Sequence, residues 1–112
     1  MEKRFPTYKA FWPHYVAEHR GKLTRNLHFL GTSLCLLSLL LAVVVSPWFL
    51  LAAPFLGYGF AWIGHLVFEK NRPATFEYPL WSLAADFHMF ALMCAGRMDR
   101  EVKRMTVLAD DK

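Results

Sequence analysis

The sequence has few residues that could build a disulfide framework or a thiolate metal site. Only two of its 112 residues are cysteines. Cys35 and Cys94 both lie in apolar stretches, without a partner at a metal-site or redox spacing. We interpret them as reduced thiols that pack against lipid or a neighbouring helix. The sequence also has no nucleic-acid-binding motif, internal repeat or low-complexity tract, so nucleic acid is not an expected partner.

A short apolar core close to the start is lacking as well. Residues 1–28 are largely polar, and we therefore expect no cleavable signal peptide. The first strongly apolar segment would then act as the insertion signal itself.

Apolar residues, in contrast, are abundant. Hydrophobic residues make up 55% of the chain and aromatic residues 16%. The polar residues gather at the two ends and in one internal loop, which is the segregation that a bilayer selects. We predict an all-α integral membrane protein of about four helices, in which residues 1–112 form a single membrane domain.

The hydrophobic pattern divides this domain into segments. Residues 1–28 are predicted to form an amphipathic helical region with an aromatic stripe, a break near Pro13 and an end at Gly21. Residues 29–45 and 49–68 carry no charge and form a transmembrane hairpin around a turn at Pro47.

Beyond the hairpin, the sequence predicts two further segments. Residues 80–96 form a third membrane-embedded helix, and residues 97–112 form a charged tail that is frayed or bound to the surface. Three closely spaced glycines, Gly57, Gly59 and Gly64, permit tight contact between helices.

The distribution of basic residues predicts the topology. Six of them precede the first apolar segment: Lys3, Arg4, Lys9, Arg20, Lys22 and Arg25. Lys70 and Arg72 follow the second segment, and the turn at Pro47 has none, so the N-terminus and the Lys70 loop are expected in the cytosol. A full crossing by residues 80–96 would place the basic tail outside, which favours partial insertion. The alternative is four helices of similar length that are all inserted into the membrane to some degree.

Two histidines are predicted to meet in the hairpin. His28 lies 19 residues before Pro47 (47 − 28 = 19), and His65 lies 18 residues after it (65 − 47 = 18). Both arms of a helical hairpin rise about 1.5 Å per residue, so the two side chains should face each other at equal depth near the cytosolic surface.

Other polar side chains can join this pair. Glu69 follows His65 by four residues on the same helix face, and Gly21 lets the chain fold back so that His19 returns to the pair. His88 lies in the third segment, two residues from Asp86. Imidazoles and carboxylates at a bilayer edge are costly unless they bind something, and this set suits non-haem Fe(II). Packing or snorkelling histidines are the alternative.

For three further residues the sequence suggests supporting or structural roles. Asn26 could hydrogen-bond a ligand or hold the first loop, and Asp86 could orient His88 or pair with Arg72. His14 is interpreted as structural.

A longer motif carries a resemblance. Residues 57–74 contain Gly-His-x-x-Phe-Glu-Lys-x-Arg-Pro-Ala, and Tyr15, His19, Asn26, His28 and Asp86 fit the same pattern. The chain from Tyr8 to Arg97 thereby resembles a membrane family long known only as a domain of unknown function. Its characterised fungal member is the 2-hydroxy fatty acid dioxygenase of phytosphingosine breakdown.

The resemblance implies an Fe(II)-dependent dioxygenase that uses O₂ to shorten a long-chain 2-hydroxy fatty acid by one carbon with release of CO₂. By position, the implied iron ligands are His19, His28 and His65, and Glu69 or His88 would complete the set. Arg72 would bind the substrate carboxylate, or serve only as a topology charge. In two respects the chain departs from the fungal pattern, which has a His-His pair in place of Glu18-His19 and about one more helical hairpin.

The location and the function class stay open at this stage. The endoplasmic reticulum and the bacterial inner membrane both suit the sequence, with membrane lipid around the apolar segments and the metal site near the cytosolic face. A non-enzymatic scaffold or accessory subunit with structural histidines is the competing interpretation. A transporter-like oligomer is a weaker interpretation, because no charged path crosses the apolar segments. A homo-oligomer is compatible with the sequence.

Overall fold

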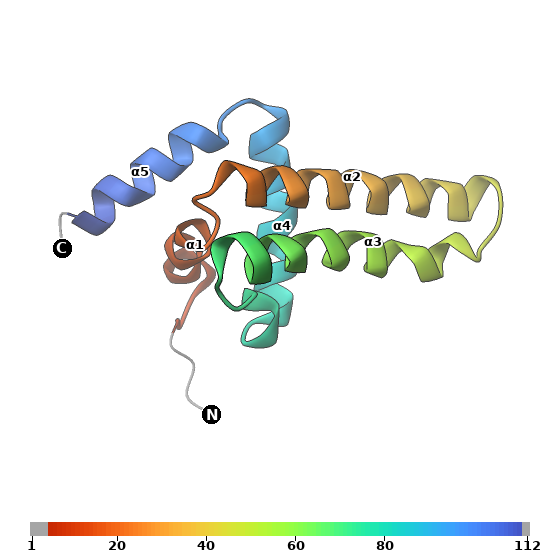
Figure 1. The fold of residues 1–112 in the computed structure, drawn as a ribbon, viewed down its shortest axis with the longest axis horizontal. Coiled ribbons are helices and arrows are strands. Elements are labelled where there is room, and N and C mark those ends of the chain that lie inside the picture. Colours follow the sequence, from red (N-terminus) through yellow and green to blue (C-terminus); the bar gives the residue numbers. More distant parts are fainter. Residues whose placement is uncertain (1–4, 111–112) are drawn as a thin grey trace. The chain divides into compact units, whose positions relative to one another are not determined.

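A computed structural model describes residues 5–110, and side chains are described as far as Val107 (Figure 1). All regular elements in this part of the chain are helices, which confirms the predicted all-α class. Lys3 and Arg4, two of the basic residues used to predict the topology, lie outside the described residues.

The chain forms two compact units. The hairpin unit contains Gly21–Pro73, and the aromatic unit contains residues 5–20 together with residues 74–110. Each unit is described by itself below. The prediction that the whole chain acts as one membrane domain stays a prediction.

The hairpin unit consists of two antiparallel helical arms. Helix α2 (Lys22–Val44) and helix α3 (Phe49–Ile63) lie side by side, and α3 continues directly into a π-helix, η1 (Gly64–Glu69) (Figure 1). The predicted turn is present, and within it the Phe49 N–H donates to the Ser46 carbonyl at 3.2 Å. Helix α2 starts seven residues before the predicted apolar segment, so His28, which was assigned to the end of the N-terminal region, lies within this helix.

Small residues allow the two arms to approach closely. A Cβ atom on Gly31 would lie 2.9 Å from the Leu56 carbonyl oxygen, and one on Gly64 would lie 2.9 Å from the Thr24 methyl group. The predicted packing role is thus confirmed for Gly64. Gly59, in contrast, has no atom of the described chain within 4 Å of its Cβ position, and Gly31 was not predicted.

The outer surface of the hairpin unit is apolar. Val43, Phe55 and Leu66 are all largely exposed. Helix α2, with 23 residues, and the continuous segment Phe49–Glu69, with 21, are each long and apolar enough to cross a bilayer.

The aromatic unit contains helix α1 (Tyr8–Ala17), a short 3₁₀-helix η2 (Ala74–Phe76), helix α4 (Pro79–Cys94) and helix α5 (Met98–Asp110). The Thr7 hydroxyl caps α1 by accepting from the Ala10 N–H at 3.1 Å. Two predicted boundaries of this first helix are wrong. It continues through Pro13, and it ends at Ala17 rather than Gly21, which instead precedes the first turn of α2.

The aromatic stripe of the N-terminal region forms the core of this unit. Phe11, Trp12, Tyr15 and Val16 are buried together with Ala85 and Met89 of α4 and Met98 and Met105 of α5. Residues 98–110, which the sequence suggested as a frayed or surface-bound tail, are a helix because these two methionines pack into that core. The Trp12 indole N–H also donates to the Glu101 carboxylate on α5 at 2.6 Å.

Candidate metal centre

His65 lies in the π-helical turn that ends the second arm of the hairpin. The next residue after this turn, Lys70, has a left-handed backbone with φ 56°, which reverses the chain. The reversal brings the Asn71 N–H to the His65 carbonyl oxygen at 2.9 Å, and the Asn71 side-chain oxygen to Nδ1 of His65 at 2.7 Å. Asn71 therefore fixes both the backbone and the ring of His65. π-Helical turns of this kind are frequent at functional sites.

His28 faces His65 from the other arm, as the sequence predicted. Their Nε2 atoms are 3.2 Å apart and their rings are perpendicular, at 87°. Both side chains are buried, at 4% and 2% exposure. Metal–nitrogen bonds of about 2.0–2.1 Å would place two adjacent ligand nitrogens roughly 3 Å apart. The observed separation therefore suits two ligands of one ion.

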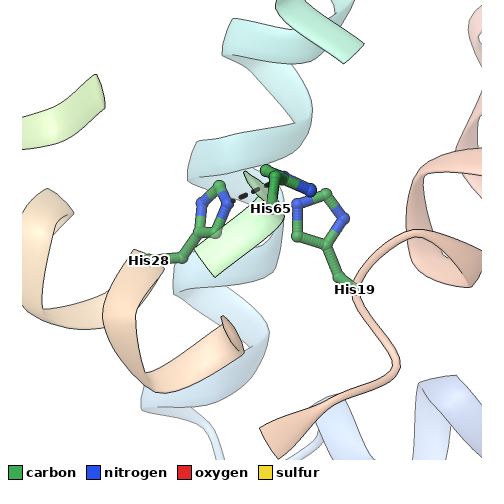
Figure 2. A group of neighbouring side chains, drawn as sticks. All are labelled: His19, His28 and His65. Carbon is green, nitrogen blue, oxygen red and sulfur yellow. Dashed lines mark hydrogen bonds between the residues drawn. The ribbon is translucent and has the colours of Figure 1, made fainter. Parts of the chain in front are cut away.

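His19 is the third buried histidine near these atoms. It belongs to the aromatic unit and lies two residues after the end of α1, close to the start of the hairpin unit at Gly21. Its side chain is fully buried. Ligand atoms of His19, His28 and His65 all lie within 4.8 Å of one another. Figure 2 shows the three rings, with a dashed line between His28 and His65.

The hydrogen bonds of these histidines suit metal binding. Nδ1 of His19 lies 2.6 Å from the Tyr15 carbonyl oxygen, and Nδ1 of His65 lies 2.7 Å from the Asn71 amide oxygen. Because both oxygens can only accept, each Nδ1 must carry the proton, and each Nε2 keeps its lone pair. Neutral imidazoles whose second nitrogen is bound to an oxygen are the usual histidine ligands of divalent transition metals. The donor set therefore fits such an ion.

Glu69 has another partner in the hairpin. Its Oε1 atom accepts from the Gly21 N–H at 2.6 Å, so this carboxylate at the end of η1 caps the start of α2. Gly21 has no side chain to cap the helix itself. A Cβ atom at position 21 would lie 2.3 Å from the same carboxylate oxygen, so a larger residue there would require the Glu69 side chain to shift. Glu69 is not among the three clustered residues, and its role as a ligand stays a prediction.

His88 and Asp86 take part in contacts within the aromatic unit. Nδ1 of His88 lies 3.0 Å from the Tyr8 hydroxyl, and its ring stacks on Trp12 with centroids 3.8 Å apart. Asp86 accepts a hydrogen bond from the Tyr15 hydroxyl at 2.5 Å. His88 is exposed and is not among the clustered residues. Its predicted role as a ligand stays a prediction.

Arg72 and His14 are not among the clustered residues either. Arg72 is exposed in the loop after η1, next to Asn71. His14, which was interpreted as structural, lies with Nε2 3.1 Å from the Glu18 carboxylate, one helical turn away.

Sequence reasoning missed the two groups that hold the histidine rings. Asn71 lies six residues from His65, which no helical spacing rule connects, and only the π-helical turn and the left-handed Lys70 bring it back. The Tyr15 carbonyl is a backbone group at the end of α1, where it also accepts from the Glu18 N–H at 3.1 Å. The four-residue spacing of Tyr15 and His19 is the one signal that could have suggested this contact.

Comparison with known proteins identifies one family. The model of the family described as 2-hydroxy-palmitic acid dioxygenase Mpo1-like matches residues 5–98. No curated protein and no solved structure gives a match.

Proposed function

The chain belongs to the 2-hydroxy-palmitic acid dioxygenase Mpo1-like family, and from this premise we propose that it is an Fe(II)-dependent dioxygenase of long-chain 2-hydroxy fatty acids. The acid would be shortened by one carbon. For a side chain R, the balance is R–CHOH–COOH + O₂ → R–COOH + CO₂ + H₂O. The electrons removed from the acid reduce O₂ completely, so this reaction needs no further reductant.

The buried cluster of His19, His28 and His65 carries the proposal. Together, these three buried imidazoles make a neutral donor set for a divalent ion. Bound Fe(II) would supply the activation of O₂, which organic side chains cannot provide. His19, His28 and His65 would hold the ion, and the Tyr15 carbonyl and Asn71 would keep the Nδ1 protons of His19 and His65 in place.

The residues around His65 also suggest where the substrate carboxylate binds. Arg72 directly follows Asn71, whose side-chain amide contacts His65. Arg72 is therefore attached to the chain one residue from a group of the proposed site. An exposed arginine can bind a carboxylate through two parallel hydrogen bonds. The acyl chain would lie along the exposed apolar surface of the hairpin.

The hairpin is proposed to insert into the membrane with its histidines near the cytosolic face. Lys22 and Arg25 begin α2, and Lys70 and Arg72 follow η1, so four basic residues gather at this end of the hairpin. The turn between Val44 and Phe49 carries none. This charge distribution supports the orientation in either a bacterial inner membrane or the endoplasmic reticulum.

The test is turnover by the purified full chain loaded anaerobically with Fe(II). We would supply 2-hydroxypalmitic acid and O₂ and measure the acid one carbon shorter, with palmitic acid as the control that lacks the hydroxyl group. We expect product only from the hydroxy acid. Arg72→Gln should raise KM about tenfold or more with a smaller change in kcat, because it removes a charged contact to the carboxylate.

Two failures would be informative in different ways. An iron-loaded protein without product would remove the dioxygenase proposal and keep a metalloprotein. A protein that binds no metal would favour the scaffold or accessory subunit with structural histidines.

A further inference from the structure

His19 differs from the other two clustered histidines in having no helix around it. It follows the C-terminus of α1, where its N–H still donates to the Val16 carbonyl at 3.0 Å. A side chain on such a turn has more freedom than one within a helix, and a ligand must be held closely to bind a metal well. Something beyond the local backbone must therefore fix the ring.

Tyr15 contacts the His19 ring in two ways. Its carbonyl oxygen lies 2.6 Å from Nδ1, and its own ring stacks on the imidazole with centroids 4.0 Å apart and planes 24° apart. Tyr15 is itself buried, with only 1% of its surface exposed. The orientation of His19 thus depends on the orientation of Tyr15.

Asp86 holds the other end of Tyr15. The Tyr15 hydroxyl donates to Oδ1 of Asp86, on helix α4, at 2.5 Å. Burial raises the pKa of Asp86 to about 7, against the opposing effect of the Tyr15 hydrogen bond. Burial also raises the pKa of Tyr15 well above its ordinary value, so the phenol keeps the proton that it donates. A carboxyl group placed here is costly, and the described contacts use it to anchor one tyrosine.

We propose that Tyr15 and Asp86 are positioning residues that orient His19 for metal binding. The Asp86 carboxyl holds the Tyr15 hydroxyl, and the Tyr15 ring and carbonyl hold the His19 imidazole. All three residues belong to the aromatic unit. The inference rests on the proposed function, because it assigns these residues a task only if His19 is a ligand.

The test measures Co(II) affinity of the purified full chain by equilibrium dialysis, since Co(II) binds imidazole and does not oxidise easily in air. Tyr15→Phe keeps the stacked ring and removes the hydroxyl, and Asp86→Ala removes the acceptor. We expect each to weaken Co(II) binding by about 10–100-fold, the usual effect of losing such an outer partner. Asp86→Asn retains an acceptor oxygen and should restore most of the affinity.

Tyr78→Phe is the matched control. Tyr78 is a buried tyrosine of the same unit whose hydroxyl accepts from the Phe5 N–H at 3.0 Å, and its ring lies against Phe11 and Trp81. Loss of the Tyr78 hydroxyl should lower thermal stability about as much as Tyr15→Phe does, yet leave the Co(II) affinity of the folded protein unchanged. A purely structural role for Tyr15 would make the two variants alike in both measurements.

The outcomes separate this inference from the proposed function. Wild-type chain that binds no Co(II) would overturn both. Wild-type chain that binds, together with Tyr15→Phe of equal affinity, would overturn the positioning role alone. Equal affinity in Asp86→Ala with weak binding in Tyr15→Phe would overturn the role of Asp86.

Discussion

The two units of this chain bury opposite kinds of side chain. In the aromatic unit the buried residues are large and apolar or aromatic, and Phe11, Tyr15 and Met89 are at most 1% exposed. In the hairpin unit, the residues that α2 buries are mainly polar or small: Thr24, Arg25, His28, Gly31, Thr32 and Ser38. Its large apolar residues, such as Leu40, Val43 and Phe55, are exposed.

This difference indicates what surrounds each unit and where chemistry is possible. An exposed apolar surface of this extent is typical of a helix pair that contacts lipid. The polar groups inside the pair are then tolerated because they bind one another, as when the Ser38 hydroxyl donates to the Phe49 carbonyl at 2.7 Å. His28 and His65 lie at the end of the hairpin away from the turn, where the basic residues of this unit gather.

The largest expected effect on stability compares one phenylalanine from each unit. Phe11→Ala removes a fully buried ring and should lower the free energy of unfolding by about 3–5 kcal/mol. Phe55→Ala changes a side chain that is 79% exposed and should cost less than about 1 kcal/mol. Denaturation of both variants in the same detergent micelles would measure this. Equal losses would break the contrast between the units.

A smaller effect is expected at the contact between the two arms of the hairpin. In Gly31→Ala the new Cβ would meet the Leu56 carbonyl oxygen at 2.9 Å, and this backbone atom cannot move without shifting α3. We expect a loss of about 1–3 kcal/mol, as for other overpacked sites.

Gly59→Ala is the control for this substitution. It lies in helix α3 with open space at its Cβ position, so helix propensity should make it neutral or stabilising by up to about 1 kcal/mol. If both alanine variants unfold at the same denaturant concentration as the wild type, the arms do not pack as described.

The smallest expected effect concerns the contact between α5 and the aromatic core. Arg104 and Trp12 hydrogen-bond to the Glu101 carboxylate and hold its pKa below the ordinary value, against a smaller opposing effect of burial. Because the pKa of Glu101 is lower in the folded state than in the unfolded state, this stabilisation is fully present above the pKa of the unfolded state. It is lost as the pH falls through the pKa of the folded state. Glu101→Gln should therefore cost about 1 kcal/mol at neutral pH.

The pH dependence gives the check on Glu101. The difference in the free energy of unfolding between wild type and Glu101→Gln should be constant above about pH 5. It should shrink below about pH 4, where the pH falls under the ordinary pKa of a glutamate. A difference that persists unchanged in acid would show that the charge of Glu101 contributes nothing to the contact.

Much of the fold could be predicted because the sequence patterns that indicate its helices and its turn are local. The two long uncharged runs and the turn at Pro47 predicted the hairpin, and the aromatic stripe predicted a first helix. Helix α5 was missed because nearly half of its residues are charged, and its packing depends on the burial of Met98 and Met105 and on the Trp12–Glu101 hydrogen bond. Which apolar surface packs inside, and which stays exposed, depends on tertiary contacts that periodicity does not contain.

The site was predictable to the extent that helix geometry is regular. Counting along the two arms placed His28 opposite His65, and the structure confirms that pairing. The same regularity failed at η1, where a π-helical turn and the left-handed Lys70 bring Asn71 rather than a helical neighbour to His65. Glu69 lies on the predicted arm, but its hydrogen bond to Gly21 depends on how the ends of the two arms come together.

The central claim is that His19, His28 and His65 hold one divalent iron, and iron content measures it most directly. The full chain would be purified anaerobically, incubated with Fe(II), freed of excess metal and analysed by elemental analysis beside two variants. We expect about one iron per chain for wild type and for His14→Ala, which changes the histidine paired with Glu18. For His65→Ala we expect less than about one tenth of that iron content, with unchanged helical content. A His65→Ala chain that binds as much iron as the wild type would rule out His65 as a ligand and with it the proposed site.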